Sequence, residues 1–198
     1  MSPFRVLHIA APGPTGGLES VVQALAVGQH GRGLSAEVAA VIHADGPSHP
    51  FLDALVEAGV GVHPLPLPPR SYLRERREVG RIIRTRRPDV VHTHGLRPDI
   101  LLAGLARRQG IPTVTTLHGS SRPAWERDRY TWLHYRLLRR FSAVVAVSKT
   151  LVPGLERGGI RGDRIFVVPN ARDERHQPLP RAEARRILNL PESAFVLG

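Results

Sequence analysis

The chain has 198 residues, of which 41% are hydrophobic, and it contains no cysteine. This length is enough for one domain with a sizeable core, and the lack of cysteine excludes disulfides, thiolate metal sites and cysteine nucleophiles. The 28 Lys and Arg residues outnumber the 17 Asp and Glu residues, and the net charge of +11 has two explanations, an arginine-rich genome composition or anionic partners.

Apolar residues along the chain switch repeatedly between the spacing of a strand and that of a helix. Strands are expected at residues 4–10, 36–42, 60–65, 89–94, 112–117, 143–147 and 164–168. Helices are expected at residues 18–31, 51–59, 71–87, 98–109, 123–141 and from 148 onwards. Strands that alternate with helices pair in parallel, and runs that are apolar on both faces are typical of a sheet covered on both sides. The sequence therefore predicts a Rossmann-like three-layer α/β/α domain with a mainly parallel sheet of about seven strands.

The pattern changes after residue 170. Residues 171–180 are polar and rich in proline, which is typical of a linker. Residues 181–190 have helical spacing, and residues 195–198 look like the start of a further strand. We therefore expect a first domain over residues 1–170, a linker over 171–180 and the start of a truncated second domain over 181–198.

A glycine-containing loop, residues 11–17, joins the first strand to the first helix. Ligands of open parallel sheets bind beyond the carboxyl ends of the strands, where a helix N-terminus offers unpaired N–H groups to an anion. Paired glycines let the backbone come close to such a group, so Gly16 and Gly17 are either a diphosphate cradle or simply a tight turn. The dinucleotide fingerprint fits poorly because its glycine spacing is different, and the Gly-Lys-Ser/Thr end of a P-loop is absent.

Two histidines end neighbouring strands, and each is followed by glycine, as His94-Gly95 and His118-Gly119. A histidine at that edge of a sheet can donate to a phosphate or sugar oxygen, or exchange a proton. His92 shares a face with His94, but no third ligand follows at a convincing spacing. We therefore expect no metal site and interpret His92 as a hydrogen-bonded core residue.

The ordered segments FRVLHIA, PTGGLE, DVVHTHG, TVTTLHG, AVVAVSK and VVPNARD cover almost the whole chain. Together they resemble the N-terminal, acceptor-side domain of the family 4 glycosyltransferases of GT-B type. The resemblance implies half of a GT-B fold and transfer of a sugar, with retention, from a nucleotide-diphospho-sugar to an acceptor. It implies no metal, and no cofactor besides this donor substrate. The chain departs from the family's N-G-hydrophobic-D hinge after Asn170, so the hinge conformation is not carried over.

The same resemblance implies roles for residues that match the family's motifs. The catalytic residue beside the transferred sugar would be His118. The donor diphosphate and sugar would be held by Gly16, Gly17 and Gly119. The acceptor would be bound by Glu19, His94 and Gly95. The nucleotide would be bound by the second domain, so we expect the present chain alone to be inactive.

The predicted helix at residues 71–87 is rich in arginine, and Tyr72, Val79 and Ile83 form a narrow apolar stripe that is expected to pack on the sheet. Some proteins of this family glycosylate lipids and dock on membranes through a basic helix at this position. The candidate membrane contacts are Arg74, Arg76, Arg77, Arg81 and Arg84. The alternative is an ordinary solvated helix face.

Three functions are compatible with the sequence. The first, implied by the resemblance, is the acceptor-binding domain of a hexosyltransferase-type enzyme in the cytoplasm, either free there or at the inner face of the cell membrane. Its partner would be a small-molecule or lipid-linked sugar acceptor. The second is a stand-alone anion-binding or membrane-docking module without catalysis. The third is nucleic-acid binding through charge alone, which ranks last because no nucleic-acid motif is present. No apolar run approaches the ~20 residues that span a bilayer, and the N-terminus lacks the features of a signal peptide.

Overall fold

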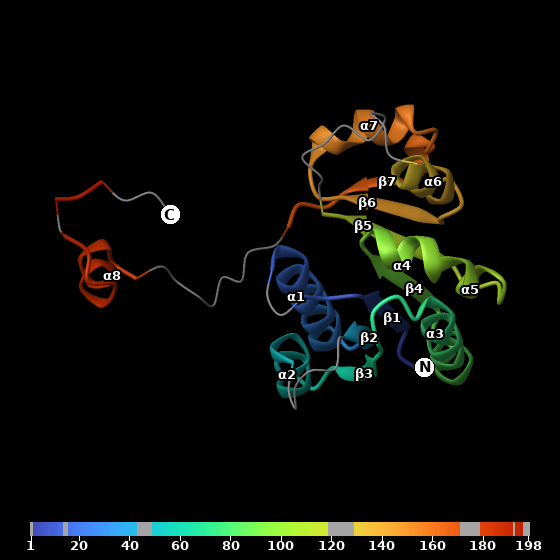
Figure 1. Ribbon diagram of the computed structural model, residues 1–198, viewed down its shortest axis with the longest axis horizontal. Helices are drawn as coiled ribbons and strands as arrows, with labels where there is room; N and C mark the ends of the chain where they lie inside the picture. The colour runs from blue at the N-terminus through green and yellow to red at the C-terminus, as the bar shows by residue number, and fades with distance from the viewer. Residues whose placement is uncertain are drawn as a thin grey trace.

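A computed structural model describes residues 2–13, 16–42, 49–118, 129–170, 179–191 and 193–195, with the backbone alone at 129–132. Its centre is a seven-stranded sheet in the order β3-β2-β1-β4-β5-β6-β7, and every neighbouring pair is parallel (Figure 1). The strands are β1 (Arg5–Ala10), β2 (Ser35–Ile42), β3 (Gly61–Pro66), β4 (Val90–His94), β5 (Thr113–Leu117), β6 (Ala143–Ala146) and β7 (Ile165–Val167). The predicted fold class is confirmed, and each predicted strand lies within about one residue of its observed bounds.

Helices cover both faces of this sheet (Figure 1). One face carries α1 (Gly17–Gly31) and α2 (Pro50–Glu57) over β2 and β3. The other face carries α3 (Tyr72–Arg86), α4 (Leu96–Leu101), α5 (Ala103–Arg107), α6 (Arg129–Leu138) and α7 (Val152–Arg157). Short 3₁₀ turns, η1 (Lys149–Leu151) and η2 (Gly162–Arg164), precede α7 and β7.

The alternation of side chains along β2 explains how one strand serves two cores. Val38 and Ala40 pack with Val22 of α1, whereas Ala39 and Val41 pack with the α3 side. A strand buried on both faces must be apolar at nearly every position, and this is why the sequence predicted a strand here.

Two predictions about helices need correction. The helix expected at residues 98–109 is two short helices, α4 and α5, separated at Leu102. Leu102 is buried in the core, its φ is −117°, and its carbonyl accepts from the Leu105 N–H three residues on, so the turn is tightened there. Tyr72 was placed in the buried stripe of α3, but it lies at the helix start and is exposed, while Ile82 takes the inner position beside Val79.

The last described helix, α8 (Arg181–Ile187), lies apart from the sheet in Figure 1. Its apolar residues Ile187 and Leu188 are exposed. Among the described residues, no helix has both the length and the apolar character needed to cross a membrane.

Candidate active site

The strand order reverses between β1 and β4, and this switch point organises the candidate site. The chain moves from β1 outward to β2 and β3, then returns to β4 on the other side of β1. The helices that follow β1 and β4, α1 and α4, therefore leave the same edge of the sheet toward opposite faces. Ligands of open α/β sheets bind at such a point, beyond the carboxyl ends of the strands.

The glycine loop lies at this edge and leads into α1. Gly16 is the N-cap of α1 and offers no side-chain hydrogen bond to the first N–H groups, which lie at the positive end of the helix dipole. The Glu19 side chain folds back, and its Oε1 accepts from the Gly13 N–H at 2.7 Å. A Cβ built on Gly16 would lie 2.5 Å from Glu19 Oε2, whereas a Cβ on Gly17 would meet no described heavy atom within 4 Å.

Gly95 brings the loop after β4 against the start of α1. Its φ of +90° is in the region that favours glycine, and a Cβ there would lie 3.5 Å from the Leu18 Cδ1 atom. The loop after β4 and the start of α1 are therefore neighbours.

A row of histidines lies on the α1 side of the sheet, just below this edge. The strand register pairs His8 of β1 with His92 of β4, and alternation places His94 on the same face. His8 Nδ1 lies 3.0 Å from His94 Nε2, and His8 Nε2 lies 2.8 Å from Gln29 Oε1 of α1. His8 and Gln29 were missed in the sequence. The signal for His8 was its place in the first strand, which pairs with the HTH strand. Gln29 gave no signal, because its contact depends on how α1 packs on the sheet.

His92 has its own partner. Its Nε2 lies 2.8 Å from Thr116 Oγ1 of β5, and both side chains are buried. The interpretation of His92 as a hydrogen-bonded core residue is confirmed.

Burial keeps these rings neutral. It lowers the pKa of His8 to about 4, although the hydrogen bond with Gln29 acts in the opposite direction. Burial also lowers the pKa of His92 and His94 well below the usual value, and the neighbouring histidines lower it further. Near neutral pH each ring therefore carries a single N–H.

His118, which follows β5, extends the row toward the open edge. Its Nε2 lies 3.4 Å from His94 Nδ1. Burial lowers its pKa, while the negative charges of Asp99 and Glu19 act against this shift. Its Nδ1 is buried and has no hydrogen-bond partner within the described part of the chain. Gly119, predicted to bind the donor, lies outside the described residues.

The nitrogens of His8, His92 and His94 lie within 4.8 Å of one another, so the structure supplies the third histidine that the sequence analysis lacked for a metal site. A metal binds in the plane of an imidazole ring, along a nitrogen lone pair. The His92 and His94 rings are stacked, with centroids 4.3 Å apart and planes at 26°, so their lone pairs do not converge on one point. We interpret the three rings as a packed cluster in which His8 is hydrogen-bonded to His94, and His92, bonded to Thr116, stacks on His94.

The opposite face of the same strands holds a buried carboxylate that was not singled out in the sequence. Asp99 Oδ1 accepts from the hydroxyls of Thr93, at 2.5 Å, and Thr115, at 2.8 Å. Its Oδ2 accepts from His134 Nε2 of α6 at 2.6 Å. Asp99 thereby joins α4, β4, β5 and α6 directly beneath the edge that carries His94 and His118.

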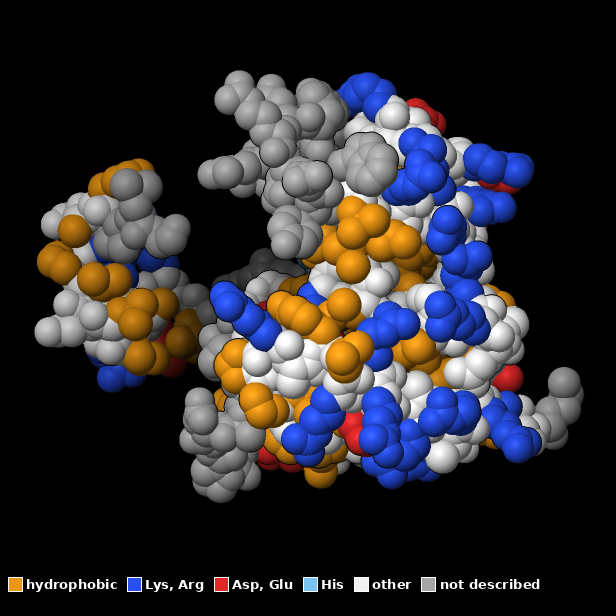
Figure 2. Space-filling model, turned by 45° about the vertical axis from the view of Figure 1, so that its right-hand side comes forward, with side chains coloured by type: hydrophobic (Ala, Val, Ile, Leu, Met, Phe, Trp, Pro, Cys, Tyr) orange, Lys and Arg blue, Asp and Glu red, His pale blue; other side chains and the backbone are white. Residues whose placement is uncertain are grey.

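The arginines of α3 lie away from this site. Arg74, Arg77, Arg81 and Arg84 are exposed, and Arg81 forms an ion pair with Glu78 at 3.0 Å. Arg76 is half-buried and donates to the Leu101 carbonyl, so its guanidinium faces α4 instead of solvent. Figure 2 shows Lys and Arg side chains spread over one side of the molecule.

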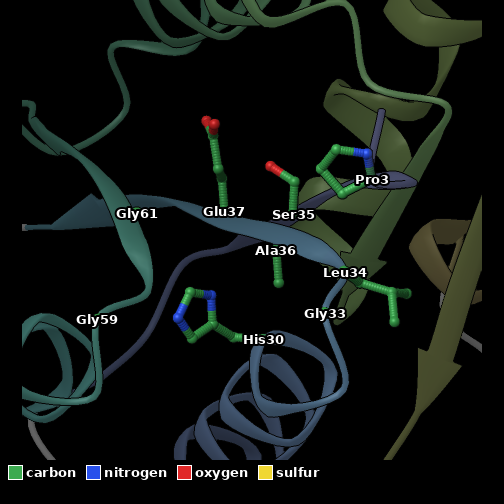
Figure 3. Close-up of a pocket in the computed structure, with 9 residues that line it drawn as sticks. All are labelled: Pro3, His30, Gly33, Leu34, Ser35, Ala36, Glu37, Gly59 and Gly61. Atoms are coloured by element: carbon green, nitrogen blue, oxygen red, sulfur yellow. The ribbon is translucent and has the colours of Figure 1, made fainter. Parts of the chain in front are cut away.

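A cavity of about 370 Å³ lies at the other end of the sheet, between the end of α1 and the starts of β2 and β3. Figure 3 shows His30 and the Ala36 side chain on one side of β2, with Glu37 pointing to the other side. Glu37 is paired with His63, at 2.5 Å, and with Arg86, at 3.3 Å. The cavity holds none of the predicted site residues, and its acidic side chain is already neutralised.

A family model described as "Glycosyl transferase 4-like domain" matches residues 16–171 of the chain. The match includes Gly16 and Gly17 at the end of the glycine loop, the histidines of β4 and His118. No curated protein sequence matches the chain.

Solved structures share the fold at low sequence identity. HepE from Anabaena in complex with UDP-glucose has a TM-score of 0.70 and 20% identity, over 93% of this chain and 49% of that one. A glycosyltransferase from Rickettsia africae has a TM-score of 0.72 and 16% identity, over 98% and 51%. A UDP-GlcNAc 2-epimerase from Neisseria meningitidis bound to UDP-GlcNAc has a TM-score of 0.59 and 17% identity, over 83% and 46%. The chain thus spans about half the length of each structure, and the fold alone does not separate transferase from epimerase.

Proposed function

We propose that this chain, which belongs to the family of glycosyl transferase 4-like domains, is the acceptor-side domain of a retaining glycosyltransferase. In the proposed reaction, the bond between the anomeric carbon of a nucleotide-diphospho-sugar and its diphosphate breaks. A bond from that carbon to an acceptor oxygen forms, and the nucleoside diphosphate and the acceptor's proton are released. The single observation that carries the proposal is the neutral His118 at the switch point, beside the N-terminus of α1, whose buried Nδ1 has no partner among the described residues.

The donor side of the proposal rests on the glycine loop. The diphosphate would lie at the free N–H groups of α1, where Gly17 leaves space and the helix dipole favours negative charge. Gly16 and Gly119 would flank it. UDP-sugars are the first donors to test, because HepE is described with UDP-glucose and the epimerase with UDP-GlcNAc.

The acceptor side would use Glu19, His94 and Gly95, which lie around the same edge. We also keep as proposals a first domain over residues 1–170, a linker over 171–180 and the start of a nucleotide-binding domain over 181–198. On this scheme the 198-residue chain by itself transfers no sugar, because one wall of the donor site is contributed by the second domain.

The test is a transfer assay on the complete gene product with radiolabelled UDP-glucose and UDP-GlcNAc. We expect sugar to pass to an acceptor, and His118→Ala to reduce the rate by about two orders of magnitude or more, the usual effect of removing one polar group that acts at the reacting centre. The matched control is His30→Ala, which removes an exposed histidine from the other end of the sheet. Epimerisation of UDP-GlcNAc without transfer, or a wild-type rate in His118→Ala, would contradict the proposal.

A lipid-linked acceptor at the inner face of the cell membrane is favoured by one observation. Leu73, at the start of α3, is 85% exposed, and it lies beside the exposed Tyr72 and Arg74. An apolar side chain surrounded by arginines suits the boundary between anionic headgroups and lipid tails.

Vesicle sedimentation tests this placement. Each arginine near an anionic surface contributes about 1 kcal/mol, so Arg74→Gln with Arg77→Gln should weaken binding to phosphatidylglycerol-containing vesicles about 30-fold. The control pair, Arg107→Gln with Arg108→Gln, removes the same charge from the exposed end of α5 and should have little effect. Equal losses in the two pairs would indicate unspecific attraction by net charge.

A further inference from the structure

The side chains that connect α1 with the open edge of the sheet form a row of hydrogen bonds with a defined direction of donation. It runs from Gln29 to His8, from His8 to His94 and from His94 to His118, with separations of 2.8, 3.0 and 3.4 Å. Its first acceptor is the Gln29 side-chain oxygen, which has lone pairs and no hydrogen. In the orientation that the structure gives the Gln29 amide, its oxygen faces His8 Nε2, so the hydrogen of that contact belongs to His8 Nε2.

Because each ring is neutral, the direction of donation in the first hydrogen bond determines the direction in the next two. A neutral imidazole has one N–H and one lone pair, so His8, which donates through Nε2, must accept at Nδ1. His94 then donates from Nε2 to His8 and accepts at Nδ1. His118 donates from Nε2 to His94, and this leaves His118 Nδ1 as a lone pair. That atom is the one that is buried and without a partner among the described residues.

We propose that Gln29 is a positioning residue which, through His8 and His94, holds His118 as the Nε2–H tautomer and presents its Nδ1 as a hydrogen-bond acceptor. The identity of the donor to that atom, a sugar hydroxyl, rests on the proposed function. The tautomer itself does not, because the internal contacts of the chain set it. A hydroxyl can satisfy the Nδ1 lone pair, whereas a carbonyl or phosphate oxygen, which only accepts, cannot.

The alternative tautomer is disfavoured by the first link of the row. If His118 carried its hydrogen on Nδ1, its Nε2 lone pair would face His94 Nδ1. Restoring a donor there would require His94 and His8 to change tautomer as well, and His8 Nε2 would then turn a lone pair toward the Gln29 oxygen. One amide on α1 therefore selects among tautomers at a site three rings away.

Long-range ¹H–¹⁵N correlation spectra of histidine-labelled protein test the inference without substrate. The unsubstituted 198-residue chain should show His8, His94 and His118 each with a protonated Nε2 and an unprotonated Nδ1. In Gln29→Leu, His118 should lose this single state, and its two nitrogen shifts should move toward each other. Gln29→Glu should retain the wild-type pattern, because a carboxylate also only accepts.

The matched control is Gln23→Leu. Gln23 is on the same helix and donates its side-chain N–H to the Phe51 carbonyl, so the change removes one side-chain hydrogen bond without touching the histidines. His118 should keep its tautomer in this variant. If Gln29→Leu does not fold, Gln29→Met serves the same purpose. A His118 protonated at Nδ1 in the wild type, or an unchanged His118 in folded Gln29→Leu, overturns the inference.

Transfer kinetics separate the inference from the proposed function. In the complete gene product, Gln29→Leu should lower kcat by about ten- to hundredfold, by analogy with residues that orient metal-bound histidines, and Gln29→Glu should recover most of it. If the spectra change as expected while transfer does not, the positioning by Gln29 stands and the role of His118 in transfer fails.

Discussion

Gly16 and Gly17 are adjacent but have different reasons to be glycine. At Gly16 an added Cβ would collide with the Glu19 carboxylate, which the Gly13 N–H holds in place. At Gly17 nothing described lies within 4 Å of an added Cβ, so the fold itself does not require a glycine there. The open space at Gly17 leaves room for a group that binds the end of the helix.

Substitution of Gly17 should therefore affect binding but not folding. Alanine at this helical position should leave the free energy of unfolding unchanged or raise it by up to about 1 kcal/mol. The same methyl group would stand where we propose that the donor diphosphate binds, so on that proposal the affinity of the complete gene product for UDP-glucose should fall at least about tenfold. Urea unfolding and calorimetric titration measure the two quantities.

The control for this change is Gly28→Ala in the same helix. Gly28 is exposed, and its added Cβ would also meet nothing within 4 Å. It should raise stability by about 1 kcal/mol and leave the affinity for UDP-glucose as it is. Equal affinities in the Gly17→Ala and Gly28→Ala variants would remove the glycine loop from the proposed donor site.

Residues of the candidate site could be predicted from the sequence where their position in a strand alone determines where they lie in the fold. His94 and His118 end parallel strands, and the carboxyl ends of such strands meet at one edge. Gln29 and Asp99 could not be found in this way. Their partners are chosen by how α1 and α4 pack on the sheet, and a one-dimensional pattern does not contain that packing.

At the scale of elements, Asp99 is the junction that supports the edge of β4 and β5. Its carboxylate is fully buried and accepts three hydrogen bonds, from Thr93, Thr115 and His134. The donors come from two strands and from α6, the helix that follows the segment after His118. A buried carboxylate with three donors fixes the spacing of these elements more tightly than apolar contacts, which have no preferred direction.

Removal of this carboxylate should be costly. Asp99→Ala leaves the buried Thr115 hydroxyl and an imidazole N–H without this acceptor, and leaves the Thr93 hydroxyl with only the Val114 carbonyl at 3.3 Å. It should lower the free energy of unfolding by about 3–5 kcal/mol. Asp163→Ala, which breaks an exposed pair with Arg161, should cost less than about 1 kcal/mol. Chemical denaturation of both variants provides the comparison, and similar losses would show that Asp99 is not a structural junction.

The helices and strands were predicted more completely than the points at which they are divided or connected. The strands of the sheet are marked by apolar runs such as AVVAV, which contains β6. These runs are bounded by polar or glycine residues, so they favour a strand over a helix. The division of one expected helix into α4 and α5 has no such mark. It depends on Leu102 turning into the core between α3 and β4, which is a tertiary effect.

At the scale of the whole molecule, the buried histidines make stability depend on pH. The pKa of His8 is about 4 in the folded chain, against an ordinary value of 6.5, and the pKa values of His92, His94 and His118 are lowered too. Below about pH 6.5 the unfolded chain binds protons that the folded chain does not, so stability falls as the pH falls. The loss continues until the folded pKa is passed, which for His8 is near pH 4.

The expected loss is large compared with the usual stability of a domain. Each histidine protonated only in the unfolded chain contributes about 1.4 kcal/mol per pH unit, and several act together over the same range. Domains of this kind have about 5–15 kcal/mol in total, so we expect cooperative unfolding well above pH 4. Urea unfolding midpoints from about pH 7.5 downward measure the slope.

Repulsion within a chain of net charge +11 would also lower stability as the pH falls, so this cause must be distinguished from the buried histidines. Salt screens repulsion between exposed charges, but it does not change the cost of charging a buried ring. The slope should therefore persist at ~1 M salt if the histidine row is its origin. It should also become shallower in His118→Asn, which removes one of the titrating rings while keeping a polar side chain at the edge. The opposite result would be a slope that vanishes in salt and is the same in His118→Asn. It would mean that the rings are accessible to protons in the folded chain. The neutral row on which the tautomer of His118 depends would then have to be abandoned.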